Sequence, residues 1–136
     1  MTVVVAHQVA PTAGLVLQHG AQEAALRGVE LVVVHVVETL DLDVEQAQRS
    51  GLAEDVKTAV SAAGSGDVSW DIQLVTGTDD IAGSVVRLAS ERKAKVLVIG
   101  ARRRSPVGKF LLGSTAQSII LDADVPVLVV KADRTD

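Results

Sequence analysis

The sequence lacks cysteine and tyrosine, and tryptophan and phenylalanine occur once each among its 136 residues, as Trp70 and Phe110. Without cysteine, the chain cannot form disulfides, thiolate metal sites or iron–sulfur clusters, and it has no cysteine nucleophile. Two such aromatic side chains are too few for the stacking platforms that bind flavins or single-stranded bases. The core must therefore be aliphatic, and the absence of cysteine fits a reducing compartment.

The chain also lacks an apolar run of the roughly 18 residues that a membrane-spanning helix needs. No basic segment precedes the apolar residues at its start, so a signal peptide is not indicated. Yet 48% of the residues are hydrophobic, which excludes a disordered, low-hydrophobicity polymer. Because single cores commonly run to about 100–150 residues, we expect one cytoplasmic domain over residues 1–136, with no membrane partner.

Positive charge is scarce in most of the chain. Residues 1–90 hold 4 Lys and Arg against 12 Asp and Glu, whereas residues 91–136 hold 9 against 5. Four of the basic residues, Arg102, Arg103, Arg104 and Lys109, lie within eight positions. This group can attract an anion, but it falls short of the broad basic patch of a duplex-DNA binder. We therefore expect no nucleic-acid partner.

Apolar, β-branched runs alternate with segments of helical periodicity. Most of the runs are continuous and predict strands buried on both faces, whereas 68–75 alternates apolar with polar residues and predicts a strand near a sheet edge. The predicted strands are 3–6, 31–37, 68–75, 96–99 and 127–130, and the helical stripes are 12–27, 52–63, 81–89 and 116–120. This order predicts an α/β fold, a single doubly wound parallel sheet of five strands with four helices on its two faces.

Polar residues mark the expected helix starts. Thr78 is a candidate N-cap for the helix over 81–89, with Asp79 and Asp80 in its first turn. Ser114 to Gln117 has the spacing of a capping box at the start of the last helix. The helix over 12–27 is expected to end at Gly28, and the one over 52–63 at Gly64.

Ligands of doubly wound sheets bind beyond the carboxyl ends of the strands, where the strand order reverses. The informative segment there is 100–115, which joins a buried strand to a helix start. Its glycines permit close backbone approach, and Ser114 and Thr115 add hydroxyl groups beside free helix N–H groups, so the segment suits phosphate. On the alternative interpretation, Gly100 and Gly113 only make turns, Ser114 only caps the helix, and the arginines are solvated.

Several known sites can be excluded. A Walker A motif needs Gly at position 103 and Ser or Thr at 110, where the chain has Arg103 and Phe110. No G-x-G-x-x-G follows the first strand, and no acids cluster there as in a receiver domain. His7, His19 and His35 show no metal-ligand spacing, so we expect no metal site and no catalytic residues. His7 is a candidate polar ligand contact, and His35 a hydrogen-bonded core residue.

With these residues identified, the chain resembles the universal stress protein family over nearly its whole length. The likeness is densest from Val98 to Ser114 and from Asp122 to Val130. Nucleotide-binding members have Gly, two residues, Gly, nine residues, Gly, then Ser or Thr. Gly100, Gly113 and Ser114 match that spacing, but Arg103 replaces the second glycine, and Gln8 stands where ATP-binding members commonly carry aspartate.

The resemblance implies an adenine nucleotide alpha hydrolase-like fold with strand order 3-2-1-4-5. It also implies a stress-response regulator or sensor that is not an enzyme and that binds ATP, AMP or cyclic AMP, with or without Mg²⁺. The adenine would lie near the ends of the first two strands and the phosphates over the glycine loop. The implied nucleotide-binding residues are Ala6, Gln8, Val36, Gly100, Arg103, Gly113, Ser114 and Thr115.

Two questions stay open at this point. The Arg103 guanidinium either fills the phosphate space or clamps phosphate in a bidentate manner. The alternative function is accordingly a dimeric protein–protein interaction scaffold whose nucleotide site has decayed. Family members usually form homodimers, and the apolar strand Val127–Val130 is the expected pairing element because an exposed apolar edge strand favours a partner.

Overall fold

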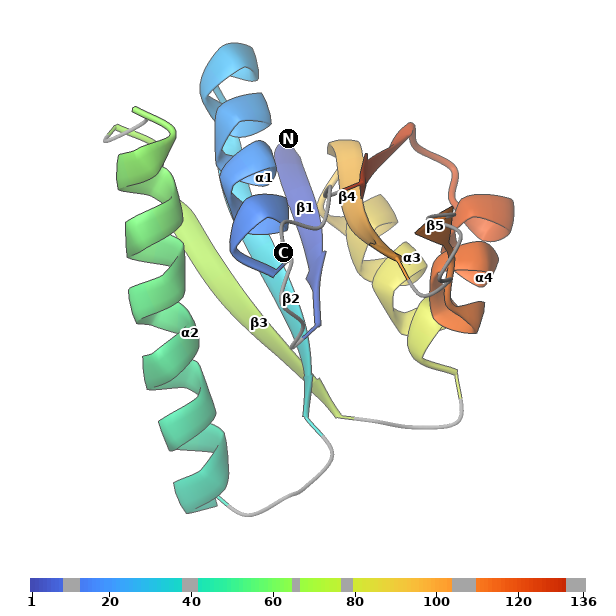
Figure 1. The fold of residues 1–136 in the computed structure, drawn as a ribbon, viewed down its shortest axis with the longest axis horizontal. Helices are drawn as coiled ribbons and strands as arrows, with labels where there is room; N and C mark the ends of the chain where they lie inside the picture. Colours follow the sequence, from blue (N-terminus) through green and yellow to red (C-terminus); the bar gives the residue numbers. More distant parts are fainter. Residues whose placement is uncertain (9–12, 38–41, 65–66, 77–79, 104–109, 132–136) are drawn as a thin grey trace.

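The computed structural model describes residues 1–8, 13–37, 42–64, 67–76, 80–103 and 110–131. Strands and helices alternate along them (Figure 1). In chain order the elements are β1 (Thr2–His7), α1 (Ala13–Arg27), β2 (Glu30–Val37), α2 (Leu42–Ala62), β3 (Trp70–Thr76), α3 (Ile81–Glu91), β4 (Ala94–Arg103), β5 (Phe110–Leu111), α4 (Ser114–Asp122) and β6 (Val127–Lys131).

Five of the strands form one parallel sheet in the order β3-β2-β1-β4-β6. This confirms the predicted doubly wound sheet, with β6 as the fifth predicted strand. The two-residue strand β5, which was not predicted, pairs antiparallel with the end of β4, Arg102 opposite Leu111. The strand order reverses between β1 and β4. The helices that follow these two strands, α1 and α4, therefore lie on opposite faces of the sheet.

The two faces of the sheet carry separate aliphatic clusters. Alternate side chains of β1, such as Val3 and Val5, join a cluster with α1 and α2, whereas Val4 joins a cluster with α3 and α4. Figure 1 shows the two helix pairs on opposite sides of the strands. Strands buried on both faces are expected to be continuously apolar, which is the pattern that the sequence shows for β1, β2 and β4.

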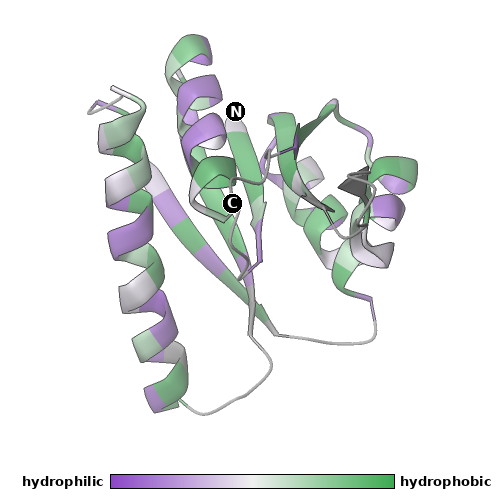
Figure 2. Cartoon of the chain, viewed as in Figure 1, coloured by the Kyte–Doolittle hydropathy of each residue, from purple (hydrophilic) through white to green (hydrophobic). Residues whose placement is uncertain are grey.

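Strand β3 lies at one edge of the sheet, as its alternating pattern predicts. Ile72 is buried against α1 and α2, while Asp71 and Gln73, on the opposite face, are half-buried. Figure 2 shows the alternation of hydrophilic and hydrophobic residues along this strand. An edge strand with one polar face is typical of a sheet that is covered incompletely on that side.

Three sequence predictions were wrong in detail. The N-cap of α3 is Asp80, whose carboxylate accepts a hydrogen bond from the Gly83 N–H at 2.8 Å; Thr78 lies outside the described residues. Gly113, not Ser114, is the N-cap of α4, and the Gln117 amide donates to the Leu112 carbonyl instead of forming a capping box. Finally, β4 continues through Gly100 to Arg103, where a loop was expected.

The predicted ends of the first two helices are confirmed. Gly28 and Gly64 both have the left-handed conformation, with φ of 65° and 69°, which glycine adopts without strain. Among the described residues, no helix is both long enough and apolar enough to cross a membrane.

Candidate functional site

A cleft opens at the carboxyl ends of β1 and β4, where the strand order reverses. The amino-terminal parts of α1, α3 and α4 border it. The residues that line it are Ala6, His7, Gln8, Ala13, Val16, Val34, Ile81, Val85, Ile99, Gly100, Thr115, Ala116 and Ile119. The sheet topology alone therefore brings segments from both halves of the chain to one place, as expected for a doubly wound fold.

The floor of the cleft is apolar and its rim is polar. Val34, Ile99 and Ile119 are at most 2% exposed, while Gln8 at the end of β1 is exposed and Thr115 is half-buried. A few polar groups around an apolar base are typical of small-molecule sites. The enclosed volume is about 50 Å³, far below the roughly 300–1,000 Å³ of such sites, so the described residues enclose only a small part of any nucleotide.

The start of α4 faces this cleft through Thr115. Gly113 precedes the helix in an extended conformation, and its carbonyl accepts the first helical hydrogen bond, from the Gln117 N–H at 3.0 Å. No side chain in the described residues caps the helix. The N–H groups of Ser114, Thr115 and Ala116 are therefore left without helical partners, and they carry the positive end of the helix dipole. This arrangement favours an anion.

The start of α3 differs because its own sequence supplies an anion. The Asp80 carboxylate accepts the Gly83 N–H, and the Ser84 hydroxyl donates to the Asp80 carbonyl at 3.1 Å. The Gly83 N–H, one of the backbone donors free at a helix start, is thus satisfied by the Asp80 side chain. Of the two helices that begin at the cleft on this face, α4 is the one whose N-terminus is open to a ligand.

Two histidines lie side by side at the ends of β1 and β2. His7 and His35 are opposite each other in the strand register, and their Nδ1 atoms are 3.0 Å apart. Each is 8% exposed. Burial, followed by the His35 ring, lowers the pKa of His7 to about 4, although the charge of Asp55 raises it in part. Both imidazoles are neutral at pH 7, and one donates its Nδ1–H to the other.

Burial also lowers the pKa of His35, and a hydrogen bond to the His7 backbone raises it in part. His35 is therefore the hydrogen-bonded core residue that the sequence predicted. His7 lines the cleft, but its Nδ1 is already engaged by His35. Its contact with a ligand stays a prediction.

The structure places the predicted nucleotide-binding residues in three groups. Ala6, Gln8, Gly100 and Thr115 line the cleft. Gly113 and Ser114 form the start of α4 beside Thr115 but are not in its lining. Val36 pairs with Val75 in the sheet and Arg103 pairs with Phe110 at the end of β4; the side chains of Val36 and Arg103 lie outside the described part of the chain.

Sequence reasoning missed the apolar helix residues of the cleft. Ile81 and Val85 of α3, and Ala116 and Ile119 of α4, belong to helical stripes that predict burial but not the cavity they border. The sequence signal that could have identified them is an apolar helical stripe that begins soon after a strand end near the point where the strand order reverses.

Comparison with known proteins identifies the domain. The model of the universal stress protein family matches residues 1–131. A universal stress protein of Mycolicibacterium smegmatis is 34% identical over 129 residues, which are 95% of this chain and 96% of that protein. One from Mycobacterium bovis is 32% identical over 84% of this chain, which spans 42% of that longer protein.

Solved structures agree. The universal stress protein of Archaeoglobus fulgidus is 33% identical, with a TM-score of 0.73 over 96% of this chain and 98% of that one. A structure of the universal stress protein from the same organism in complex with dAMP is 32% identical, with a TM-score of 0.71 over the same shares of the two chains. Together with the sheet order and the reversal-point cleft, these matches show that the chain belongs to the universal stress protein family.

Proposed function

We propose that this domain is a stress-response regulator or sensor that binds an adenine nucleotide in the cleft between β1 and β4. The observation that carries the proposal is the convergence of Gln8, Gly100 and Thr115 at the reversal point. The similarity to a universal stress protein whose structure holds dAMP supports it. A bound nucleotide would couple occupancy of the cleft to the surfaces that α3 and α4 present.

The proposed site divides into a nucleoside part and a phosphate part. Ala6, Gln8 and Val36 lie at the ends of β1 and β2 and would contact the base and ribose, with the Gln8 amide as a hydrogen-bonding group. The phosphates would lie at the open N-terminus of α4, where backbone N–H groups and a hydroxyl can donate to oxygen. The residues assigned to this part are Gly100, Arg103, Gly113, Ser114 and Thr115.

We propose binding without turnover. In the described part of the chain, no three His, Asp or Glu side chains gather as they would around a metal ion. Gln8 supplies no carboxylate at the cleft, so a nucleoside triphosphate would have to bring its Mg²⁺ without an acidic ligand from this position. ATP, AMP and cyclic AMP are therefore compared with and without Mg²⁺.

The test is calorimetric titration of the purified protein with these three nucleotides. The double variant Ser114→Ala with Thr115→Ala is expected to weaken binding at least tenfold, because hydroxyl donors beside the helix start are lost. Ser61→Ala, an exposed position on α2, is the matched control and is expected to bind like the wild type. Unchanged affinity in the double variant would show that the assigned phosphate site is wrong.

Arg103 is tested in the same experiment. If its guanidinium clamps phosphate, Arg103→Gly weakens binding. If it fills the phosphate space, Arg103→Gly binds more tightly than the wild type, because the variant restores the glycine spacing of nucleotide-binding members.

A second candidate function is a dimeric protein–protein interaction scaffold without nucleotide. Gln8 and Arg103 favour it, because they stand at positions where binding members carry other residues. Absorbance near 260 nm of freshly purified protein separates the two candidates. Because the chain has one tryptophan and no tyrosine, a retained adenine would dominate the spectrum.

We also propose a homodimer that pairs through β6, Val127 to Val130. This strand is the last of the parallel sheet, and Val127, Leu128 and Val129 are half-buried on it. An apolar edge strand leaves backbone groups that a second copy can satisfy, and a two-fold pair uses the same strand on both copies. Light scattering is expected to give twice the chain mass of 14.1 kDa.

A further inference from the structure

Each outer strand of the parallel sheet turns the backbone N–H and C=O groups of alternate residues away from the sheet. The Leu31 N–H donates to the Ser69 carbonyl at 2.9 Å, and Leu31 is opposite Trp70 in the register. In a parallel ladder the residues of a strand alternate in the direction of their N–H and C=O groups. The groups of Asp71 and Gln73 therefore face β2, and those of Trp70, Ile72 and Leu74 face away from the sheet.

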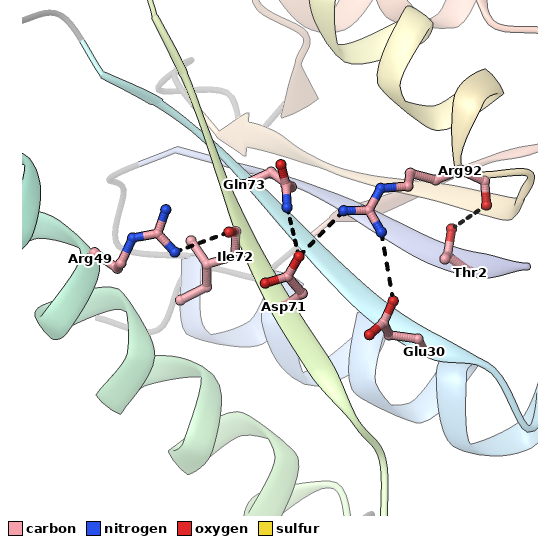
Figure 3. Close-up of polar contacts among 7 residues, drawn as sticks. All are labelled: Thr2, Glu30, Arg49, Asp71, Ile72, Gln73 and Arg92. Carbon is pink, nitrogen blue, oxygen red and sulfur yellow. Dashed lines mark hydrogen bonds and ion pairs between the residues drawn. The ribbon is translucent and has the colours of Figure 1, made fainter.

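One of these outward groups is already bound. The Arg49 guanidinium reaches from α2 and donates to the Ile72 carbonyl at 3.2 Å (Figure 3). Ile72 lies near the middle of β3, so the Arg49 side chain lies across the line that a further strand would follow. A pairing strand would have to displace this charged group from its acceptor.

The polar face of β3 adds a second obstacle. The Asp71 carboxylate accepts from the Gln73 amide at 2.6 Å and from the Arg92 guanidinium at 3.3 Å, and Arg92 also pairs with Glu30 at 3.8 Å. Figure 3 shows this chain of contacts across the starts of β2 and β3. A neighbouring strand would place its side chains against Asp71 and Gln73, and burying such groups without new partners is costly.

The β6 edge offers the opposite chemistry. The Leu97 N–H donates to the Pro126 carbonyl at 2.9 Å, and Leu97 is opposite Val127. The backbone groups of Val127 and Val129 therefore face away from β4, and aliphatic side chains flank them on both faces. Charged side chains on an edge are a known protection against strand pairing. Among the described residues, Arg49, Asp71 and Arg92 lie along β3, whereas the charged residue of β6 is Lys131 at its end.

We propose that Arg49 and the Asp71–Arg92–Glu30 group close the β3 edge to strand pairing, so that self-association through the sheet is confined to the β6 edge and stops at two copies. This inference rests on the dimer of the proposed function. Arg49 does not line the nucleotide cleft, and its role here is to limit assembly at the β3 edge. Without such closure, a two-edged sheet would permit open-ended association of copies.

The test converts the β3 edge into one like β6. The opened variant combines Arg49→Ala, Asp71→Val and Gln73→Val, which leaves the Arg92–Glu30 pair in place. Its matched control carries three substitutions on the exposed side of α2, Lys57→Ala, Thr58→Val and Ser61→Val. Light scattering over a hundredfold range of protein concentration measures mass, and far-UV circular dichroism verifies that each variant is folded.

Trp70 reports on the edge that pairs, because it is the sole tryptophan and begins β3. We expect the wild type and the control to stay at two copies, with Trp70 emission independent of concentration. The opened variant should grow beyond two copies as concentration rises, and its Trp70 emission should shift in parallel. An opened variant that is folded and stays at two copies with constant emission would overturn the proposal.

A fourth substitution separates this proposal from the dimer. Val129→Pro removes an N–H that faces away from β4, so it blocks pairing at β6 without removing a ladder hydrogen bond; Val129→Thr keeps that N–H as its control. With Val129→Pro added, the opened variant should form pairs through β3, seen by the Trp70 shift. A monomeric wild type would overturn the β6 dimer, whereas absence of β3 pairing in this fourfold variant would overturn closure by Arg49 and Asp71.

Discussion

The two faces of the sheet are built from the same kinds of residues but covered differently. One face lies under α1 and α2, helices of 15 and 21 residues, and its cluster is continuous from β3 to β4. The other lies under α3 and α4, helices of 11 and 9 residues, which border the cleft. Five of the residues that line the cleft belong to α3 and α4, and two, Ala13 and Val16, belong to α1.

This difference indicates a division of roles. Burial of aliphatic side chains is the main favourable contribution to folding, and both clusters supply it. The cleft, the open start of α4 and the candidate nucleotide contacts lie with the α3 and α4 face. Changes at residues under α1 and α2 that do not line the cleft should therefore alter stability alone, whereas changes at cleft-lining residues of α4 should alter stability and ligand binding together.

The largest expected effect compares one buried residue from each face. Leu17 of α1 and Ile119 of α4 are 1% and 2% exposed. Truncation of either to alanine is expected to lower the free energy of unfolding by about 2–5 kcal/mol, measured by urea unfolding. Ile119→Ala should also weaken nucleotide binding, because Ile119 lines the cleft, whereas folded Leu17→Ala should bind like the wild type.

Milder variants keep this comparison usable if either alanine variant unfolds. Ile119→Val should cost about 0.5–1.5 kcal/mol, and Leu17→Met should cost less than about 1.5 kcal/mol. Equal loss of affinity in both folded variants would contradict the division of the two faces.

A smaller effect tests how closely α1 packs. A Cβ atom added at Gly20 would overlap the Val5 side chain of β1, whereas one added at Gly51 of α2 would meet nothing. Gly20→Ala is therefore expected to destabilise by about 1–3 kcal/mol through overpacking. Gly51→Ala should stabilise by about 0.5–1 kcal/mol through helix propensity. Thermal unfolding measures both, and a neutral Gly20→Ala would show that α1 can shift outward.

The sequence predicted the fold well because local patterns and topology agree. Continuous apolar runs, helical stripes and the left-handed Gly28 and Gly64 each act over a few residues, and right-handed crossovers then leave few arrangements. The close contact of Gly20 with Val5 could not be predicted, since it depends on the distance between a helix and a strand that no local pattern encodes.

The candidate site was predicted in part for the same reason. Gln8 and Gly100 follow from their places on β1 and β4, and the topology brings both to one cleft. The predicted N-cap residues were wrong because several residues at each helix start could hold the cap position. Asp80 lies one residue before α3, and Gly113 holds the cap position of α4, which leaves Ser114 inside the helix. The pairing of His7 with His35 depends on the register between strands, which sequence alone does not give.

The start of α3 has a side-chain cap, whereas the start of α4 on the same face has none among the described residues. Loss of the Asp80 carboxylate in Asp80→Ala is expected to lower the free energy of unfolding by about 1 kcal/mol, because the Gly83 N–H loses its acceptor. Asp80→Ser should retain most of the stability. Urea unfolding compares the two, and equal losses would show that charge, not the hydrogen bond to Gly83, accounts for the effect.

A pH-dependent comparison concerns the histidine pair at the carboxyl ends of the strands, where His7 lines the cleft. The folded pKa of His7, about 4, lies below its ordinary value of 6.5, and that of His35 is also lowered. Below pH 6.5 the unfolded chain therefore binds more protons at these histidines than the folded chain does. The free energy of unfolding should fall as the pH drops from 6.5 toward 4. The slope is bounded by about 1.4 kcal/mol per pH unit for each histidine.

Urea unfolding between pH 7 and pH 5 measures this slope in a range where most carboxylates stay ionised. His7→Asn is expected to make this slope shallower, because one of the two paired histidines no longer binds a proton, and His19→Asn is measured beside it. His19 serves as the control because it lies on α1 outside the pair. If His7→Asn and the wild type show the same slope, the histidine pair does not account for the loss of stability at acid pH.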